Sequence, residues 1–226
     1  MNGLSLCARY AFAPNYLKYC GPDKNRELAG YLTHFAADVG LKAMLEKFEA
    51  MRPYLKLIAH ENFIGDEFNE RVVEAYWLGN KLLDKVTLKS FYRHVQLRLK
   101  AKELKWFELK LPQGAKPNHQ FHVFNFINRT GHRAVQHTVE TMDQCRISWG
   151  KVLPGGKVTT QKLLFQAGRL QLTPAVKKFK NIVDEFSPGD LATLHWGWVC
   201  EKISPQQAKN LAFYTNLALR LANTTI

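Results

Sequence analysis

The sequence predicts an α+β protein with a helical first half, a β-rich second half and a closing helix. Apolar residues recur at helical spacing through most of residues 25–104, which is the pattern of helices with one buried face. Residues 111–118 are rich in Pro and Gly, which interrupt regular structure. After this stretch the apolar residues alternate with a period of two, as in strands. We therefore expect two domains, a helical bundle in residues 1–115 and a β domain in residues 116–226.

The helical bundle is expected to begin with a short helix and to continue with four longer ones. Their predicted bounds are residues 4–12, 25–37, 41–58, 67–78 and 87–104. Asn2 or Ser5 caps the first helix, and Pro14 should break it, since Pro disfavours the helical conformation in the residue before it. Pro53 should kink or split the helix at residues 41–58.

The second half is expected to form a small β-barrel with a helix docked on it. Strands are predicted at residues 119–127, 146–153, 157–165, 169–172, 176–179 and 191–199, with a short helix at residues 133–143. Ser204 and Pro205 mark the start of the last helix, because Pro is favoured at the first helical position.

Composition indicates a soluble, globular protein of 226 residues, 46% of them hydrophobic and 23% charged. No apolar run approaches the about 20 residues that a membrane span needs. The N-terminus lacks the basic region and long apolar core of a signal peptide. We expect a cytoplasmic protein that has no membrane partner.

The four cysteines are too few and too scattered for a disulfide framework, and none lies in a Cys-x-x-Cys motif. In a reducing compartment they are free thiols or metal ligands, and many cysteines act only as small apolar core residues. Core packing is the interpretation that we favour for Cys200. In a regular strand Cys200 and His195 point to opposite faces, because they are five residues apart.

Two segments carry the strongest functional signal. Cys145 opens a predicted strand that ends on Gly-Lys-Val and is followed by a Pro-Gly-Gly turn. Further along, a Pro-Gly-Asp turn precedes the strand that carries His195 in the sequence His-Trp-Gly-Trp. Strand pairing can bring residues together that are distant in sequence. We therefore expect Cys145 and His195 to lie close together.

The order and spacing of these motifs resemble the HypC/HupF/HoxL family of nickel–iron hydrogenase maturation chaperones. In that family a cysteine, a Gly-Lys-Val-type strand end, a Gly-Asp turn, a His-x-Gly-aromatic strand and a C-terminal helix follow one another. The resemblance covers residues 145–215 and implies a HypC-like (OB-like) β-barrel. The run from Cys7 to Pro22 is similar to the start of uncharacterised hydrogenase-associated proteins.

The resemblance implies that Cys145 and His195 are the functional pair, as catalytic and metal-binding residues, with the cysteine in contact with iron. A thiolate and an imidazole suit an iron that carries cyanide or carbonyl ligands. The implied protein is a cytoplasmic metallochaperone whose partners are hydrogenase maturation proteins or the hydrogenase large subunit. In the family the cysteine is N-terminal and lies beside a free amine. Here 144 residues precede Cys145, so any role of that amine is lost.

The N-terminal run offers further binding groups. Arg9 lies close to Cys7 in the sequence and could hold an anionic ligand, and Tyr10 follows it. Cys20 precedes a Gly-Pro turn, and irregular backbone commonly displays binding groups. We expect Cys7, Arg9, Tyr10 and Cys20 to bind the cofactor, in a composite pocket with Cys145 between the two domains.

Two pairs of histidines have spacings that do not favour a shared metal. His119 and His122 fall on opposite faces of a predicted strand, and His132 and His137 lie five residues apart across a predicted helix start. Both pairs are better explained as structural residues.

Two other classes of function remain open. The net charge is +13, and residues 116–226 hold 14 Lys or Arg against 6 Asp or Glu, compared with 18 against 13 before them. A basic OB-like nucleic-acid-binding protein is therefore one alternative, although nucleic acid is the less favoured partner. The other is a cysteine-dependent enzyme with a pocket between the domains. Phosphate-loop, dinucleotide and Ser-His-Asp signatures are missing from the sequence.

Overall fold

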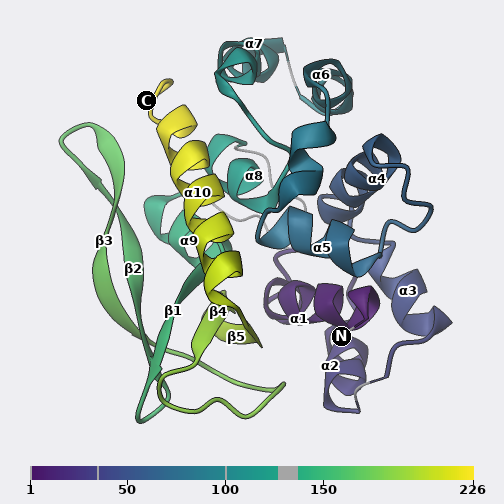
Figure 1. Ribbon diagram of the computed structural model, residues 1–226, viewed down its shortest axis with the longest axis vertical. Helices are drawn as coiled ribbons and strands as arrows, with labels where there is room; N and C mark the ends of the chain where they lie inside the picture. The colour runs from purple at the N-terminus through teal and green to yellow at the C-terminus, as the bar shows by residue number, and fades with distance from the viewer. Residues whose placement is uncertain (1, 35, 100, 127–136) are drawn as a thin grey trace.

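The computed structural model describes residues 2–34, 36–99, 101–126 and 137–226. Helices occupy most of the chain up to residue 145, and strands follow (Figure 1). The helices of this part are α1 (Gly3–Tyr16), α2 (Asn25–Thr33), α3 (Val39–Leu45), α4 (Met51–Glu61), α5 (Glu70–Trp77), α6 (Leu88–Gln96), α7 (Ala101–Lys110), α8 (His119–Asn125) and α9 (Val139–Cys145), with short 3-10 helices at Lys81–Lys85 and Leu111–Gln113. The strands are β1 (Ser148–Leu153), β2 (Lys157–Gln166), β3 (Arg169–Lys178), β4 (Leu191–His195) and β5 (Trp198–Lys202), and α10 (Pro205–Ala222) follows them. The predicted α+β class is confirmed.

Capping side chains start several helices where the sequence predicts. Asn2 accepts a hydrogen bond from the Ser5 amide at 2.9 Å and begins α1. Ser204 forms a capping box with Gln207 at the start of α10, with Pro205 in the first turn. These side chains satisfy amide groups that have no partner within the helix.

Two of the predicted helices are split, and one continues further than predicted. Residues 41–58 fall into α3 and α4, with Pro53 in the first turn of α4, where a missing amide hydrogen costs little. Residues 87–104 likewise fall into α6 and α7. The prediction that Pro14 breaks the first helix is wrong, because α1 continues through Pro14 to Tyr16.

The strand predicted at residues 119–127 is wrong where the structure describes it, because these residues form α8. Asn118 caps this helix by accepting a hydrogen bond from the Phe121 amide at 2.9 Å. The short helix predicted at residues 133–143 is α9, which begins at Val139 within the described residues, whereas residues 133–136 lie outside them.

The five strands form an open antiparallel sheet in the order β3-β2-β1-β4-β5. The predicted closed barrel is not confirmed, because among the described residues the sheet edges meet only in an isolated bridge between Lys180 and Trp198. The predicted strand at residues 191–199 is two strands, since a tight turn at Trp196 and Gly197 separates β4 from β5. The predicted strands at residues 169–172 and 176–179 are one strand, β3.

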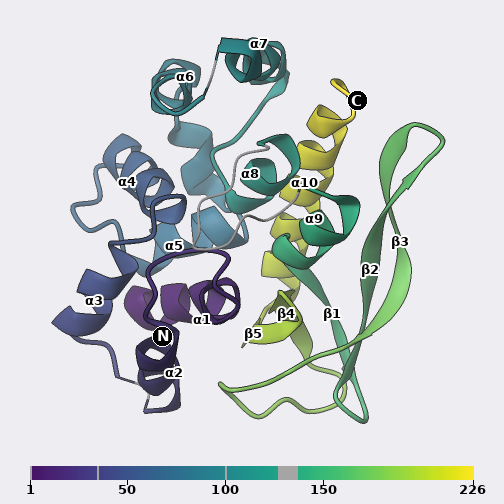
Figure 2. The ribbon, with the colours of Figure 1, turned by 180° about the vertical axis from the view of Figure 1, so that it is seen from behind.

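Helix α10 lies between the sheet and the other helices, and α1 packs against β4 and β5 (Figures 1 and 2). One buried cluster includes Phe12 of α1, Phe91 of α6, Phe121 of α8, Ile147 and Leu211 of α10. Residues from both predicted domains therefore share a core, and functional groups from both halves can meet inside it.

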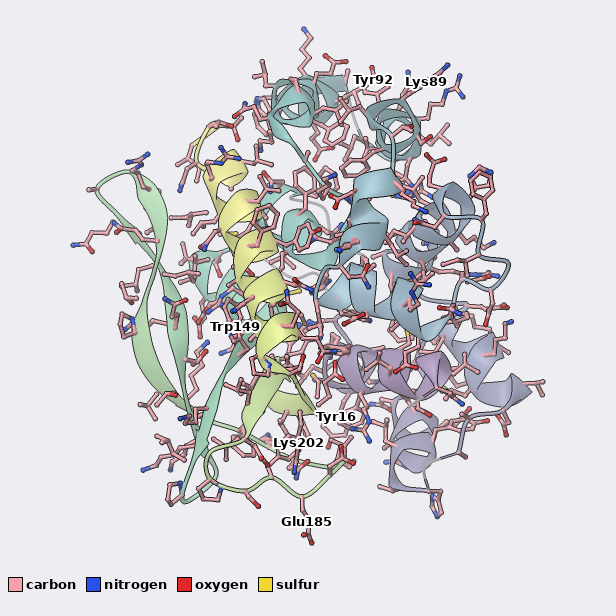
Figure 3. All side chains as sticks on the ribbon, viewed as in Figure 1. Tyr16, Lys89, Tyr92, Trp149, Glu185 and Lys202 are labelled. Carbon is pink, nitrogen blue, oxygen red and sulfur yellow. The ribbon has the colours of Figure 1, made fainter. Side chains whose placement is uncertain are left out.

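Exposed charged side chains occur on helices and on strands alike. Lys89 of α6 and Lys202 of β5 lie at opposite ends of the view in Figure 3, and both are exposed. Among the described helices, none is long and apolar enough to cross a membrane.

Candidate metal centre

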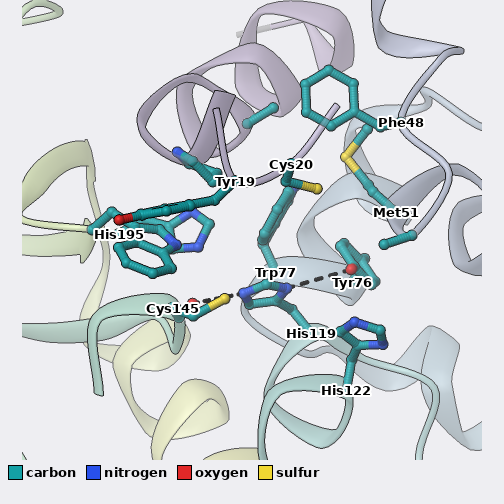
Figure 4. Close-up of a pocket in the computed structure, with 14 residues that line it drawn as sticks. Tyr19, Cys20, Phe48, Met51, Tyr76, Trp77, His119, His122, Cys145 and His195 are labelled. Carbon is teal, nitrogen blue, oxygen red and sulfur yellow. Dashed lines mark hydrogen bonds between the residues drawn. The ribbon is translucent and has the colours of Figure 1, made fainter. Parts of the chain in front are cut away.

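Three residues from separate elements bring possible metal ligands together inside the protein. His119 begins α8, Cys145 ends α9 and His195 ends β4. One ligand atom from each lies within 4.8 Å of the other two. Figure 4 shows the three side chains in one pocket. The expected proximity of Cys145 and His195 is confirmed, and His119 joins them.

Hydrogen bonds orient the His119 ring. Its Nε2 lies 2.8 Å from the Cys145 carbonyl oxygen, and a carbonyl can only accept, so Nε2 carries a hydrogen. Nδ1 lies 3.4 Å from the Tyr76 hydroxyl, which can donate to it. Both ring nitrogens of His119 therefore have a hydrogen-bonding partner.

The neighbour of His119 ties α8 to the chain that follows Cys145. The Gln120 side chain donates to the Ile147 carbonyl oxygen at 2.8 Å and accepts from the Ile147 amide at 3.1 Å. This amide pair acts like one step of a β-ladder. It holds His119 and Cys145 next to each other, although 26 residues separate them in the sequence.

Cys145 occupies a helix end and not the start of a strand, which corrects the sequence prediction. Arg146 leaves the helix with an extended backbone, and β1 begins at Ser148. The Arg146 side chain is 1% exposed and forms an ion pair with Asp143 at 2.9 Å. A buried charge needs such a partner, and the pair fixes the backbone beside Cys145.

His195 is buried, with 2% of its surface exposed. It lines the internal pocket, just before the turn at Trp196 and Gly197, which have φ angles of 51° and 77°. Its Nδ1 lies 2.7 Å from the backbone oxygen of Tyr10. The oxygen accepts, so Nδ1 carries the hydrogen, and the lone pair of the neutral ring is on Nε2.

Aromatic contacts hold both imidazoles. The His119 and His195 rings meet edge to face, with centroids 5.0 Å apart. Trp77 lies against both, at centroid distances of 4.6 Å and 5.6 Å, and Tyr10 stacks on Trp77 at 5.1 Å. Packing of this kind limits the rotation of the two rings.

The three residues line a cavity of about 50 Å³, which exceeds the roughly 10–15 Å³ that a single water molecule needs. Most of its wall is apolar or aromatic. The other lining residues are Ala11, Pro14, Tyr19, Cys20, Phe48, Ala50, Met51, Tyr76, Trp77, His122 and Trp196. Cys20 and Cys145 share this cavity, which is the part of the expected composite pocket that the structure contains.

The remaining predicted cofactor-binding residues lie in different surroundings. Cys7 is fully buried, with its Sγ 3.3 Å from Sδ of Met51, and burial raises the pKa of its thiol. Arg9 pairs with Asp184, at 2.9 Å for one of the two contacts. Tyr10 points its hydroxyl to Glu201 at 2.6 Å. Of these predicted residues, only Cys20 lines the cavity.

The structure also places Cys200 and residues of the two histidine pairs. Cys200 is fully buried, as predicted. His119 and His122 both line the cavity, because α8 is a helix and residues three apart share its face. His132 lies outside the described residues. The signal that could have revealed His119 is Asn118, a favoured helix cap directly before it.

One thiolate and two imidazoles form a ligand set suited to a transition metal such as zinc, iron or copper, and not to magnesium or calcium. Three protein ligands leave a coordination position for an exogenous group. The adjoining cavity offers space for a small one.

The chain belongs to a family of unknown function, DUF6390, whose model matches residues 1–226. No match was found among the curated proteins or among the solved structures.

Proposed function

We propose that this protein binds a transition metal through His119, Cys145 and His195 and serves as an accessory factor in metal-centre assembly. The observation that carries the proposal is the convergence of three ligand atoms within 4.8 Å from three separate elements. The hydrogen bond from His195 Nδ1 to the Tyr10 carbonyl oxygen leaves the lone pair of the neutral ring on Nε2, where it can bind a metal. His119 would exchange one of its two hydrogen bonds, to the Cys145 carbonyl oxygen or to the Tyr76 hydroxyl, for the metal. Metal ligands are commonly held by such outer hydrogen bonds.

The favoured assembly process is nickel–iron hydrogenase maturation, with iron as the metal and cyanide or carbonyl as its further ligands. Support for this specific form comes from the resemblance of residues 145–215 to the HypC/HupF/HoxL family, in which the residues matching Cys145 and His195 are the functional pair. The small apolar cavity beside them has a size compatible with diatomic ligands.

Metal content and affinity test the proposal directly. We expect the reduced wild-type protein to bind Fe²⁺ and Co²⁺. The Co²⁺ form should show a thiolate-to-cobalt charge-transfer band. The Cys145→Ala variant should lose this band and should bind both metals only weakly. Cys20→Ala is the matched control, because Cys20 lines the same cavity without belonging to the cluster of three. Equal binding by wild type and Cys145→Ala would refute a metal centre at this position.

Infrared spectroscopy tests the hydrogenase part separately. Protein purified anaerobically together with its maturation partners should show bands of iron-bound cyanide or carbonyl, and Cys145→Ala should not. If protein from cells that assemble active hydrogenase binds metal tightly but shows no such bands, the hydrogenase role is refuted, and the protein binds its metal for another process.

A cysteine-dependent enzyme is the second candidate, and the proximity of the Cys145 thiol to two imidazoles favours it. A histidine close to a cysteine can activate it as a nucleophile. In metal-free protein, alkylation of Cys145 by iodoacetamide should then be fast at neutral pH and should slow in a His195→Gln variant. Slow alkylation in both proteins would argue against the enzyme.

A further inference from the structure

The carbonyl oxygen of Tyr10 occupies an unusual position in helix α1. In an α-helix each carbonyl accepts a hydrogen bond from the amide four residues later. For Tyr10 that residue is Pro14, which lies inside α1 and has no amide hydrogen. The ring of a proline also crowds the carbonyl four residues before it. The Tyr10 carbonyl is therefore excluded from the regular helical ladder.

His195 supplies a donor to this carbonyl. Its Nδ1 lies 2.7 Å from the oxygen of Tyr10, and both residues are buried. A buried carbonyl needs a donor, so the loss of one helical hydrogen bond is balanced by a bond from a distant strand. Because Nδ1 must donate, the lone pair of the neutral imidazole is on Nε2.

The side chain of Tyr10 also contacts the hairpin that β4 and β5 form. Its hydroxyl donates to Glu201 on β5 at 2.6 Å and lies 3.0 Å from the Thr193 hydroxyl on β4. One residue of α1 thus contacts β5 and also β4, the strand that ends with His195. The hairpin is fixed against α1 by the tyrosine, and the histidine ring is fixed by the carbonyl.

We propose that Pro14 is a positioning residue that sets the tautomer of His195. By withholding an amide hydrogen, it reserves the Tyr10 carbonyl for His195 Nδ1 and leaves Nε2 as the nitrogen that can bind a metal. Any other residue at position 14 would offer an amide that shares this carbonyl oxygen with His195 and weakens the preference for a hydrogen on Nδ1. His195 needs Nε2 for a metal only if the function proposed above is correct, whereas its tautomer follows from the hydrogen bond alone.

The test compares full-length wild type with a Pro14→Ala variant, both metal-free and labelled with ¹⁵N in the histidine rings. Long-range ¹H–¹⁵N spectra distinguish the two neutral tautomers. We expect His195 of the wild type to be protonated at Nδ1, and the variant to populate the Nε2-protonated form. Affinity for Co²⁺ should fall by about 10- to 100-fold in the variant, as is typical when an outer partner of a ligating histidine is lost.

Pro53→Ala is the control, because Pro53 lies in the first turn of α4, where amides have no helical acceptor. It should leave both the spectrum and the affinity unchanged. An Nε2-protonated His195 in the wild type would overturn the proposal, even if Pro14→Ala failed to fold. A well-folded Pro14→Ala variant with the wild-type tautomer would also overturn it. If the wild-type protein binds no metal, the proposed metal function is refuted. The tautomer of His195 in the two proteins still tests the role of Pro14.

Discussion

Glu201 is a buried carboxyl group in contact with the residue that holds His195. It is 8% exposed, and burial is the largest effect on its pKa, which is raised to about 7 despite the nearby Tyr10 hydroxyl and Arg9 charge. Near neutral pH this group therefore exchanges a proton. Its ionisation places a negative charge against Tyr10, in the junction between α1 and the β4–β5 hairpin.

The first prediction concerns the stability of the protein against pH. The pKa of Glu201 rises from 4.5 to about 7 on folding, so the folded state binds more protons between these values. The contribution of Glu201 to the free energy of unfolding is complete below pH 4.5 and is lost as the pH rises through about 7. The loss amounts to roughly 3 kcal/mol, at about 1.4 kcal/mol per pKa unit. Urea unfolding across this range should show the decline.

A Glu201→Gln variant separates this carboxyl from other titrating groups. Glutamine can still accept the Tyr10 hydrogen bond but carries no charge, so the decline with pH should be smaller than in the wild type. The variant should be the more stable protein above the folded pKa. Parallel pH profiles of the two proteins would exclude Glu201 as the cause.

At the residue scale, two of the three candidate metal ligands were predictable. Cys145 and His195 stand in recognisable turn and strand motifs, and their proximity is confirmed. His119 was missed because its spacing from His122 was interpreted on a strand, where residues three apart point to opposite faces. The contribution of the Tyr10 backbone could not be predicted, since no side-chain pattern reports which carbonyl a distant histidine reaches.

At the scale of elements, α8 escaped prediction because it is buried on nearly all sides. Five of its seven residues are buried, so it lacks the polar face from which an amphipathic helix is recognised. The β4–β5 hairpin escaped for a different reason. Its turn places Trp196 at a φ of 51°, a conformation that bulky residues rarely adopt. A turn of Asn-Gly type would have been recognisable.

Gln120 leads to a prediction about how elements are joined. A Gln120→Leu variant should lose about 2–4 kcal/mol in the free energy of unfolding, because the buried amide and carbonyl of Ile147 would both lose their partner. Gln206→Leu is the matched control, since Gln206 is exposed and its side chain donates to Asn210 on its own helix. Urea unfolding measures both, and equal stabilities would contradict the bracing role of Gln120.

At the scale of the molecule, contacts across residue 115 decide whether the second half can stand alone. Phe121 packs against Phe91 and Phe107, with ring centroids 5.5 Å and 6.0 Å apart. The Tyr214 hydroxyl of α10 donates to the Asn80 carbonyl oxygen at 3.1 Å. These contacts belong to one buried cluster, so removing residues 1–115 would expose apolar surface that the sheet does not cover.

We therefore expect the fragment of residues 116–226 neither to fold cooperatively nor to bind metal by itself. The fragment retains His119, Cys145 and His195 but lacks the Tyr10 carbonyl and the Trp77 ring that orient the two imidazoles. Co-expression with residues 1–115 should restore both properties, because the two halves bury a common core. Circular dichroism, ¹H–¹⁵N spectra and Co²⁺ titration measure the outcome. A dispersed spectrum and tight Co²⁺ binding by the fragment alone would show that the β domain is independent and that α1 is not needed to form the site.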